Sequence, residues 1–211
     1  MTGRPPPPER VFIDGPAGPV EALVERPATP AHGLFAVCCH PHPLYGGTMD
    51  NKVVHALARA ARDVGVPAIR FNFRGVGGSQ GSYDDGIGET DDALAVADWA
   101  TAEFGGRPLA MGFSFGSFVA YGLALSRAAE RLVLVAPPVQ RFDFTQLAVP
   151  HCPWLVVQGD ADELVNHEAV TGWTRSLKPA PEVSLFAGAD HFFHGRISEL
   201  RDAVKGWLEA S

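Results

Sequence analysis

The sequence predicts a single-domain α/β fold, in which a mostly parallel central sheet carries helices on both faces. Two observations lead to this prediction. The 211-residue chain is 46% hydrophobic and 19% charged, which suits one globular domain with a sizeable core. Continuous apolar runs of strand length also alternate along the chain with segments of helical periodicity, as in parallel sheets covered by helices. We expect residues 1–10 to form a proline-rich tail and residues 11–211 to form the domain.

The first elements predicted are two short strands, at residues 11–14 and 20–24. The segment between them contains Gly-Pro pairs, so the two strands are expected to form an antiparallel hairpin. Residues 33–40 read GLFAVCCH, and such a continuous apolar run fits a strand buried on both faces. Residues 49–64 have apolar side chains at helical spacing, and the pattern stops at Gly65, as at the end of a helix.

The alternation of strand and helix continues to the end of the chain. Further strands are expected at residues 66–73, 107–113, 131–138, 153–160 and 182–188, and further helices at residues 90–104, 117–126, 167–177 and 197–208. Ligands of such sheets collect at the carboxyl ends of the strands, so the loops that follow strands are where chemistry is expected. These loops begin at His40, Arg74, Ser114, Pro137, Asp160 and Ala189.

Composition and charge indicate the cellular compartment of the protein and the classes of partner that it lacks. The formal net charge is -7 and no basic stripe stands out, which argues against a nucleic-acid partner. The N-terminal MTGRPPPPER has no apolar core of a secretory signal, and no apolar run approaches the roughly 20 residues of a membrane span. Three cysteines, an odd and low number, fit a reducing compartment. We therefore expect a cytoplasmic monomer or homodimer with no nucleic-acid or membrane partner.

The loop at Ser114 carries the most specific motif. Residues 112–116 read GFSFG and match G-x-S-x-G. An apolar strand precedes the motif and a helix rich in small residues follows it, which is the strand–turn–helix context that the motif requires. The sharp turn lifts the serine Oγ above the sheet, and the glycines let the backbone pass close by. The alternative is a tight turn with a capping serine, but the context favours Ser114 as a nucleophile.

A serine hydroxyl needs a base, and the base needs an orienting acid. In chains with this motif the acid and then the histidine follow the serine. Asp160 and Asp162 both follow a buried strand, and we expect Asp162 to turn inward over the site while Asp160 shapes the turn. His191 directly follows the last strand and is the expected base, whereas His194 is expected to be a capping or surface residue.

The negative oxygen of a tetrahedral intermediate requires preorganised hydrogen-bond donors. The backbone N–H of Phe115, the residue after the nucleophile, should supply one of them. The second should come from residues 40–47, HPHPLYGG, in which the two prolines have no N–H to donate. His42, Leu44 and Tyr45 remain, and we expect Leu44 to be the second donor, with His42 as the next candidate.

Two segments resemble metal or cofactor sites, and the sequence argues against both. His40 and His42 could ligate a metal, but no third ligand stands at a recognisable spacing and there is no H-E-x-x-H motif. We expect His40 to form structural hydrogen bonds instead. Residues 74–79, RGVGGS, match neither the dinucleotide fingerprint nor the Walker A motif. We therefore expect no metal and no cofactor, and we expect Asn72 and Arg74 to be hydrogen-bonded to neighbouring loops.

Aromatic residues near the loop ends predict a partly apolar substrate pocket. The side chains expected to form it are those of Tyr45, Phe113 and Phe193, with Phe115, Phe142 and Phe144 also near its mouth. Residues 139–152, which connect two predicted strands, can hold at most one turn of helix. The site is therefore expected to be open, without a lid.

Several segments together carry a family resemblance: HPHPLYGGTMDNKVV, RFNFRGVGGSQGS, GFSFG, QGDADELV and DHFFHG. Over nearly its whole length the chain resembles the α/β-hydrolase superfamily, and more narrowly a small bacterial family of serine hydrolases of the compact, dienelactone-hydrolase-like type. The resemblance implies hydrolysis at an ester-like carbonyl, with Ser114, Asp162 and His191 as the triad. One difference concerns the subtype, because dienelactone hydrolases proper use a cysteine nucleophile and this sequence has a serine.

These inferences converge on a serine hydrolase that cleaves small soluble carboxylic esters or thioesters through an acyl-enzyme. Two alternatives stay open. One is a peptidase or amidase that uses the same triad. The other is a scaffold of this fold that binds a partner without catalysis.

Overall fold

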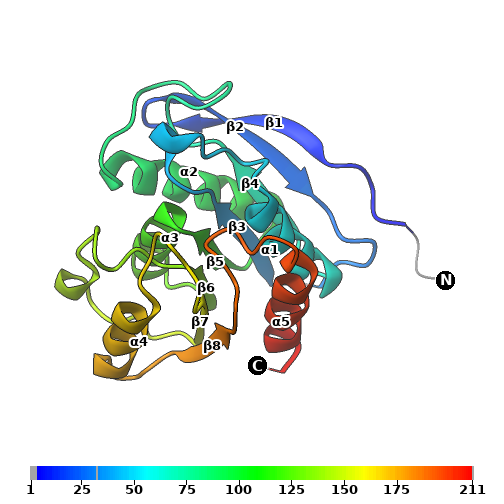
Figure 1. Ribbon diagram of the computed structural model, residues 1–211. Coiled ribbons are helices and arrows are strands. Elements are labelled where there is room, and N and C mark those ends of the chain that lie inside the picture. Colours follow the sequence, from blue (N-terminus) through cyan, green and yellow to red (C-terminus); the bar gives the residue numbers. More distant parts are fainter. Residues whose placement is uncertain (1–3, 32, 211) are drawn as a thin grey trace.

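The computed structural model describes residues 4–31 and 33–210, and within them the chain forms an eight-stranded sheet with helices packed on both faces (Figure 1). The strands are β1 (Glu9–Gly15), β2 (Gly18–Glu25), β3 (Leu34–Cys39), β4 (Ala68–Phe71), β5 (Arg107–Phe113), β6 (Arg131–Val135), β7 (Trp154–Gly159) and β8 (Glu182–Phe186). The helices are α1 (Lys52–Asp63), α2 (Ile87–Phe104), α3 (Phe115–Ser126), α4 (His167–Ser176) and α5 (Ile197–Ala210).

The strand order is β1-β2-β4-β3-β5-β6-β7-β8. Strands β1 and β2 form the predicted antiparallel hairpin, and β2 also pairs antiparallel with β4. From β4 to β8 all pairings are parallel, so the mostly parallel sheet is confirmed. The chain crosses over between β3 and β4, which places β3 beside β5 and brings the loops after these two strands together.

The N-terminal boundary differs from the expected one. Strand β1 begins at Glu9, so Glu9 and Arg10 belong to the hairpin and not to the tail, because they pair with Val24 and Leu23 of β2. Residues 1–3 of the expected tail lie outside the described residues.

Both faces of the central strands are buried, which explains why these strands are mostly apolar. Helices α1 and α5 cover one face, and α2, α3 and α4 cover the other (Figure 1). Along β5 the side chains alternate between the two resulting cores: Leu109 and Met111 face α1 and α5, whereas Ala110 faces α2 and α3. None of the helices in the described ranges has the length and hydropathy needed to cross a bilayer.

Local capping sets where the helices near the strand ends begin. Helix α1 starts at Lys52, later than predicted, because the Asn51 side chain accepts hydrogen bonds from the N–H groups of Val53 and Val54. Helix α3 starts at Phe115, earlier than predicted, directly after Ser114. The connection between β6 and β7 contains one short 3₁₀ turn, Phe144–Gln146, so the absence of a lid there agrees with the prediction.

Candidate active site

Ser114 occupies the sharp turn between β5 and α3. Its backbone has φ 53 and ψ -124, a conformation that residues other than glycine rarely adopt. The flanking glycines are sterically required. A Cβ on Gly112 would lie 2.0 Å from the carbonyl oxygen of Gly116, and a Cβ on Gly116 would lie 2.3 Å from the carbonyl oxygen of Cys39. The glycines of the motif are therefore required by close backbone contacts at the end of β5. These contacts place the Ser114 hydroxyl at the carboxyl end of the sheet.

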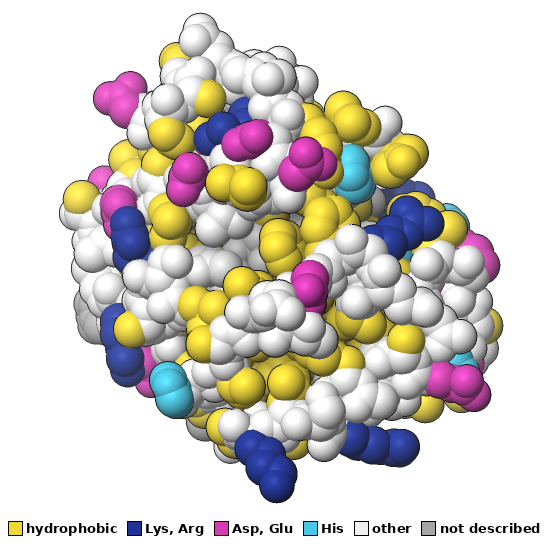
Figure 2. All heavy atoms as spheres, turned by 90° about the vertical axis from the view of Figure 1, so that its left-hand side faces the viewer, with side chains coloured by type: hydrophobic (Ala, Val, Ile, Leu, Met, Phe, Trp, Pro, Cys, Tyr) yellow, Lys and Arg dark blue, Asp and Glu magenta, His cyan; other side chains and the backbone are white. Residues whose placement is uncertain are grey.

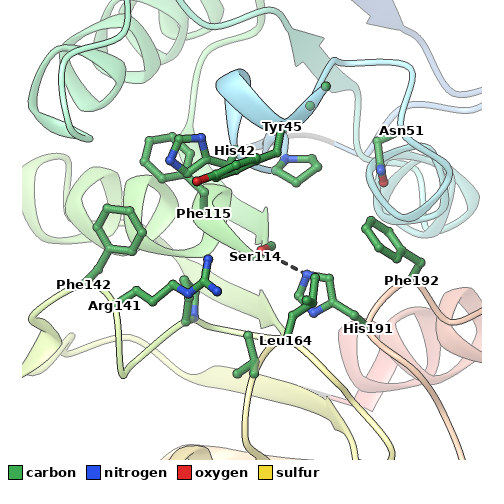
Figure 3. A pocket seen from close by; sticks show the side chains of 15 residues that line it. His42, Tyr45, Asn51, Ser114, Phe115, Arg141, Phe142, Leu164, His191 and Phe192 are labelled. Carbon is green, nitrogen blue, oxygen red and sulfur yellow. Dashed lines mark hydrogen bonds between the residues drawn. The ribbon is translucent and has the colours of Figure 1, made fainter.

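The structure brings Ser114, His191 and Asp162 together in one chain of hydrogen bonds. The distance between Ser114 Oγ and His191 Nε2 is 3.1 Å (Figure 3). On the other side of the ring, His191 Nδ1 lies 2.8 Å from Asp162 Oδ2. The three residues come from the loops after β5, β8 and β7, as the sequence predicted. The arrangement has the polarity that proton transfer requires, since a hydroxyl donates to the imidazole and the imidazole donates to a carboxylate.

The surroundings of Asp162 keep it ionised. Its side chain is fully buried, and burial by itself raises the pKa of a carboxyl group. The opposing effects are larger in sum, because His191 and the backbone N–H groups of Val165 and Leu164 all donate to the carboxylate. The pKa of Asp162 therefore lies below its ordinary value. Gln158 donates to the same carboxylate from β7 at 3.1 Å and completes its set of donors.

The two rejected candidates for the acid and the base lie where the sequence placed them. Asp160 accepts a hydrogen bond from the Gly188 N–H at 2.6 Å and links the loops after β7 and β8. His194 is exposed, and its Nδ1 lies 2.7 Å from Asp190 Oδ2. Neither residue lines the cavity around Ser114.

The loop after β3 corrects the preference for Leu44 as an oxyanion donor. The Leu44 N–H donates to Nδ1 of His42 at 3.3 Å, and Leu44 is not among the residues that line the cavity. The reason is the short 3₁₀ helix Pro43–Tyr45, which turns Leu44 outward. His42 is the N-cap of this helix, and its side chain accepts the Leu44 N–H. His42 itself lines the cavity, as Phe115 does. Within the described residues the N–H groups of His42 and Phe115 donate to no protein acceptor.

His40 is a structural residue. Its Nε2 accepts the N–H of Phe73 at 3.0 Å, and its Nδ1 lies 2.6 Å from the carbonyl oxygen of Pro41, to which it donates. Burial lowers the pKa of His40 to about 4, against a smaller opposing effect of the Pro41 carbonyl. Both ring nitrogens are therefore occupied in a neutral imidazole. No group of three or more His, Cys, Asp or Glu in the described ranges is arranged to hold a metal ion.

Ser114 and His191 lie at a cavity of about 400 Å³. The side chains around it come from the loops after β3, β5, β6, β7 and β8, and hydrophobic side chains gather in the middle of the face shown in Figure 2. The residues that line it are Pro41, His42, Tyr45, Gly46, Gly47, Asn51, Ser114, Phe115, Pro138, Arg141, Phe142, Leu164, Val165, His191 and Phe192. Tyr45, Phe115 and Phe142 are thus where the sequence placed them.

Phe113 and Phe193 were wrongly predicted to form the pocket. Both are fully buried in the core against α1 and α5. The alternation of β5 turns Phe113 beneath His191, at a ring-centroid distance of 5.0 Å. The positive φ of Phe193 turns its ring inward onto Phe186. Phe144 is also buried, on the opposite face of the sheet.

Sequence reasoning missed several residues of the cavity. Phe192 lines it in place of its neighbour Phe193, and is 39% exposed. Arg141 extends into it from the loop after β6, and Leu164 from the loop after β7 (Figure 3). The only available signal was position, because each of them follows the carboxyl end of a strand within a few residues.

Comparison with known proteins places the chain in a family. Residues 21–151 match the family model described as X-Pro dipeptidyl-peptidase (S15 family). The chain is also 35% identical over 210 residues to an uncharacterised protein of Rickettsia prowazekii, covering 94% of this chain and 88% of that protein. The chain belongs to the S15 family, within the α/β serine hydrolases.

Solved structures of other α/β serine hydrolases share the fold along almost the whole chain. A serine hydrolase homologue from Coxiella burnetii is 42% identical, with a TM-score of 0.91 over 95% of this chain and 97% of that one. A serine hydrolase without a lid from Xanthomonas campestris is 40% identical, with a TM-score of 0.92 over 98% of this chain and 96% of that one. The narrower likeness to dienelactone hydrolases stays a prediction for this hydrolase.

Proposed function

We propose that this hydrolase cleaves small soluble carboxylic esters or thioesters by nucleophilic catalysis at Ser114. The observation that carries the proposal is the hydrogen-bonded series at the cavity wall, with Ser114 Oγ 3.1 Å from His191 Nε2 and His191 Nδ1 2.8 Å from Asp162 Oδ2. A serine on a strained turn, a buried histidine and an ionised acid behind it are the parts that acyl transfer requires.

In the proposed mechanism His191 accepts the Ser114 proton as Oγ attacks the substrate carbonyl. Asp162 orients the imidazole and stabilises the imidazolium that forms. The oxyanion is held by the backbone N–H groups of Phe115 and His42, which have no protein acceptor within the described residues. His191 then protonates the leaving alcohol or thiol, and water attacks the acyl-enzyme with His191 as the base. No cofactor takes part in these steps.

The cavity supports small and soluble substrates. Its volume of about 400 Å³ is at the lower end of ordinary ligand pockets. Much of its wall is apolar, with Phe142, Leu164 and Phe192 around the serine. The β6–β7 connection forms no lid, so this connection provides no cover whose opening a lipid interface would have to trigger.

The test is hydrolysis of p-nitrophenyl acetate, butyrate and octanoate by the wild type and by Ser114→Ala, with and without a chelator. We expect activity to fall with acyl length, to be insensitive to the chelator, and to drop by at least about 10³-fold in Ser114→Ala. Circular dichroism should show that the variant stays folded. Activity that survives Ser114→Ala would remove this serine as the nucleophile.

A peptidase or amidase is the second candidate, because the matching family model carries the description of a peptidase. The same three residues would serve it. An ester and its matching amide, assayed side by side with an X-Pro p-nitroanilide, separate the two activities. We expect the ester to be preferred, and faster cleavage of the p-nitroanilide than of short esters would favour the peptidase.

The non-catalytic scaffold is the third alternative. It predicts neither hydrolysis nor covalent labelling of Ser114 by a fluorophosphonate. A labelled Ser114 without hydrolysis of the simple esters would instead indicate a hydrolase of narrow specificity.

A further inference from the structure

Among the described residues, those that line the cavity beside Ser114 carry one formal positive charge and no negative one. Among the residues that line it, Arg141 is the sole Lys, Arg, Asp or Glu. In the view of Figure 3 its guanidinium points into the cavity, with Ser114 between it and His191. The chain as a whole has a formal net charge of -7, so the sign of the charge in the cavity is opposite to that of the molecule.

The Arg141 guanidinium has no partner among the described residues, either as a hydrogen bond or as an ion pair. The nearest acid in sequence, Asp143, is engaged elsewhere, since its carboxylate accepts the N–H and the hydroxyl of Thr145. The backbone of Arg141 is held in place, because its N–H donates to the carbonyl oxygen of Pro138 at 2.9 Å. The loop therefore fixes the base of the side chain and leaves the donors at its end available to a ligand.

His42, a titratable residue of the same cavity on which the charge of Arg141 acts, adds little to this charge. Its pKa is lowered first by burial and then by the charge of Arg141, against a smaller opposing effect of Asp85. His42 is thus mainly neutral at neutral pH, and Arg141 remains the cation that a substrate meets.

We propose that Arg141 determines specificity by binding a carboxylate carried by the substrate, so that the preferred esters are organic anions. This inference rests on the proposed function of Ser114. A guanidinium presents parallel N–H donors in a planar fork that matches a carboxylate. A phosphate would call for more donors, whereas the rest of the wall near Arg141 is apolar, with Phe142 and Pro138. A substrate bearing an ammonium group, such as a free peptide amino terminus, is repelled.

The kinetic test uses matched esters and matched variants. In one series the charge is on the alcohol part: 4-acetoxybenzoate, the neutral 4-acetoxybenzamide and the cationic 4-acetoxyphenyltrimethylammonium. In the other series the charge is on the acyl part: monophenyl adipate and the neutral phenyl hexanoate. The variants are Arg141→Gln, Arg141→Lys and, as a control with the same change of net charge, Arg59→Gln on the exposed side of α1.

We expect the ratio of KM for the anionic ester to KM for its neutral partner to rise about 10-fold in Arg141→Gln in at least one series. Arg141→Lys should restore part of the preference, and Arg59→Gln should keep the wild-type ratio. The wild-type preference should weaken as salt is added. A ratio that Arg141→Gln leaves unchanged in both series, or a wild-type preference for the cation, overturns the proposal.

A binding measurement separates failure of this proposal from failure of the proposed function. Calorimetry on Ser114→Ala compares 4-acetamidobenzoate with 4-acetamidobenzamide, and is repeated on Ser114→Ala/Arg141→Gln. We expect the carboxylate to bind about 10-fold more weakly when Arg141 is replaced. This result does not depend on whether Ser114 is the nucleophile. Equal binding of the carboxylate to the two proteins would refute the role of Arg141.

Discussion

At Ser114 the backbone itself stores strain, and the surrounding hydrogen bonds hold it. A positive φ outside glycine costs of order 1–3 kcal/mol. The Ser114 N–H donates to the Val135 carbonyl of β6 at 2.9 Å, and the Ser114 carbonyl accepts the N–H of Ser117 at 2.8 Å. The turn is therefore fixed from both sides, and the hydroxyl is positioned before any substrate arrives.

The aromatic residues show why single side chains are harder to assign than a motif. Phe192 and Phe193 are adjacent and chemically identical, yet one lines the cavity and the other is buried in the core. The positive φ of Phe193 turns its side chain toward the core, and no sequence pattern predicts a positive φ at a phenylalanine.

His40 gives a prediction about acid stability. Its pKa of about 4 in the folded chain lies below the roughly 6.5 of an unfolded chain. The unfolded state therefore binds the proton more readily between these values, and stability falls as the pH falls through this window. We expect His40 to contribute a loss of about 2 kcal/mol in the free energy of unfolding between pH 7 and pH 5.

Urea unfolding of the wild type and of His40→Gln at the two pH values measures this loss. The glutamine keeps a donor and an acceptor but does not titrate. Acidic groups such as Asp162 contribute equally to both proteins, so the difference between the two losses isolates His40. The same pH dependence in the two proteins would contradict the prediction.

At the scale of the elements, the contact between the start of α3 and the end of β3 shapes the site. Gly116 lies in the first turn of α3, where a Cβ would lie 2.3 Å from the Cys39 carbonyl oxygen and 2.5 Å from that of His40. Both obstacles are backbone atoms and cannot rotate away. The approach brings the loop that carries His42 next to Ser114.

We expect Gly116→Ala to push β3 and α3 apart. Overpacking in a core typically costs about 1–3 kcal/mol, and here the backbone itself must move. The variant should therefore lose several kcal/mol in the free energy of unfolding and most of its hydrolytic activity. Gly206→Ala is the matched control, since it lies in α5 with nothing within 4 Å of the added Cβ. It should stabilise the protein by up to about 1 kcal/mol. The measurements are thermal unfolding and ester hydrolysis of the two variants. Equal stability and equal activity of the two variants would be evidence against the importance of the contact between α3 and β3.

The elements themselves were predictable because both faces of this sheet are covered. The central strands are mostly apolar, and α1, α4 and α5 each have a periodic apolar stripe, so most of the elements and their order along the chain could be predicted from the sequence. Their first residues could not, because caps such as Asn51 and the turn at Ser114 decide where a helix starts.

At the scale of the whole molecule, ion pairs connect parts of the chain that are distant in sequence. Arg74 follows β4, and its side chain and backbone N–H all donate to Asp92 of α2. The Asp92 side chain is 1% exposed and that of Arg74 is 11% exposed. Arg74 is thus hydrogen-bonded as expected, but to a helix and not to a loop. The expectation for Asn72 is confirmed, because its side chain accepts the N–H of Met49 in the loop before α1.

We expect Asp92→Ala to lower the free energy of unfolding by about 3–5 kcal/mol, because the largely buried Arg74 loses its buried partner and keeps the exposed Asp84, 3.9 Å away. Asp98→Ala on the same helix is the control. It removes an exposed pair with Arg127 and should cost at most about 1 kcal/mol. Urea denaturation compares the two variants, and an equal loss would mean that burial does not set the value of these pairs.

The fold class, the order of the strands and helices along the chain, the absence of a lid in the β6–β7 connection and the meeting of Ser114, Asp162 and His191 could all be predicted from the sequence. These follow from local signals: apolar periodicity, a glycine motif whose spacing is imposed by backbone contacts, and polar residues at strand ends. Three features follow only from the tertiary structure: His42 and not Leu44 lines the cavity, Phe192 lines it in place of Phe193, and Arg141 extends into it. Each depends on a local backbone turn or on the strand order, which places the loops after neighbouring strands side by side, and local periodicity carries no information about distances across the sheet.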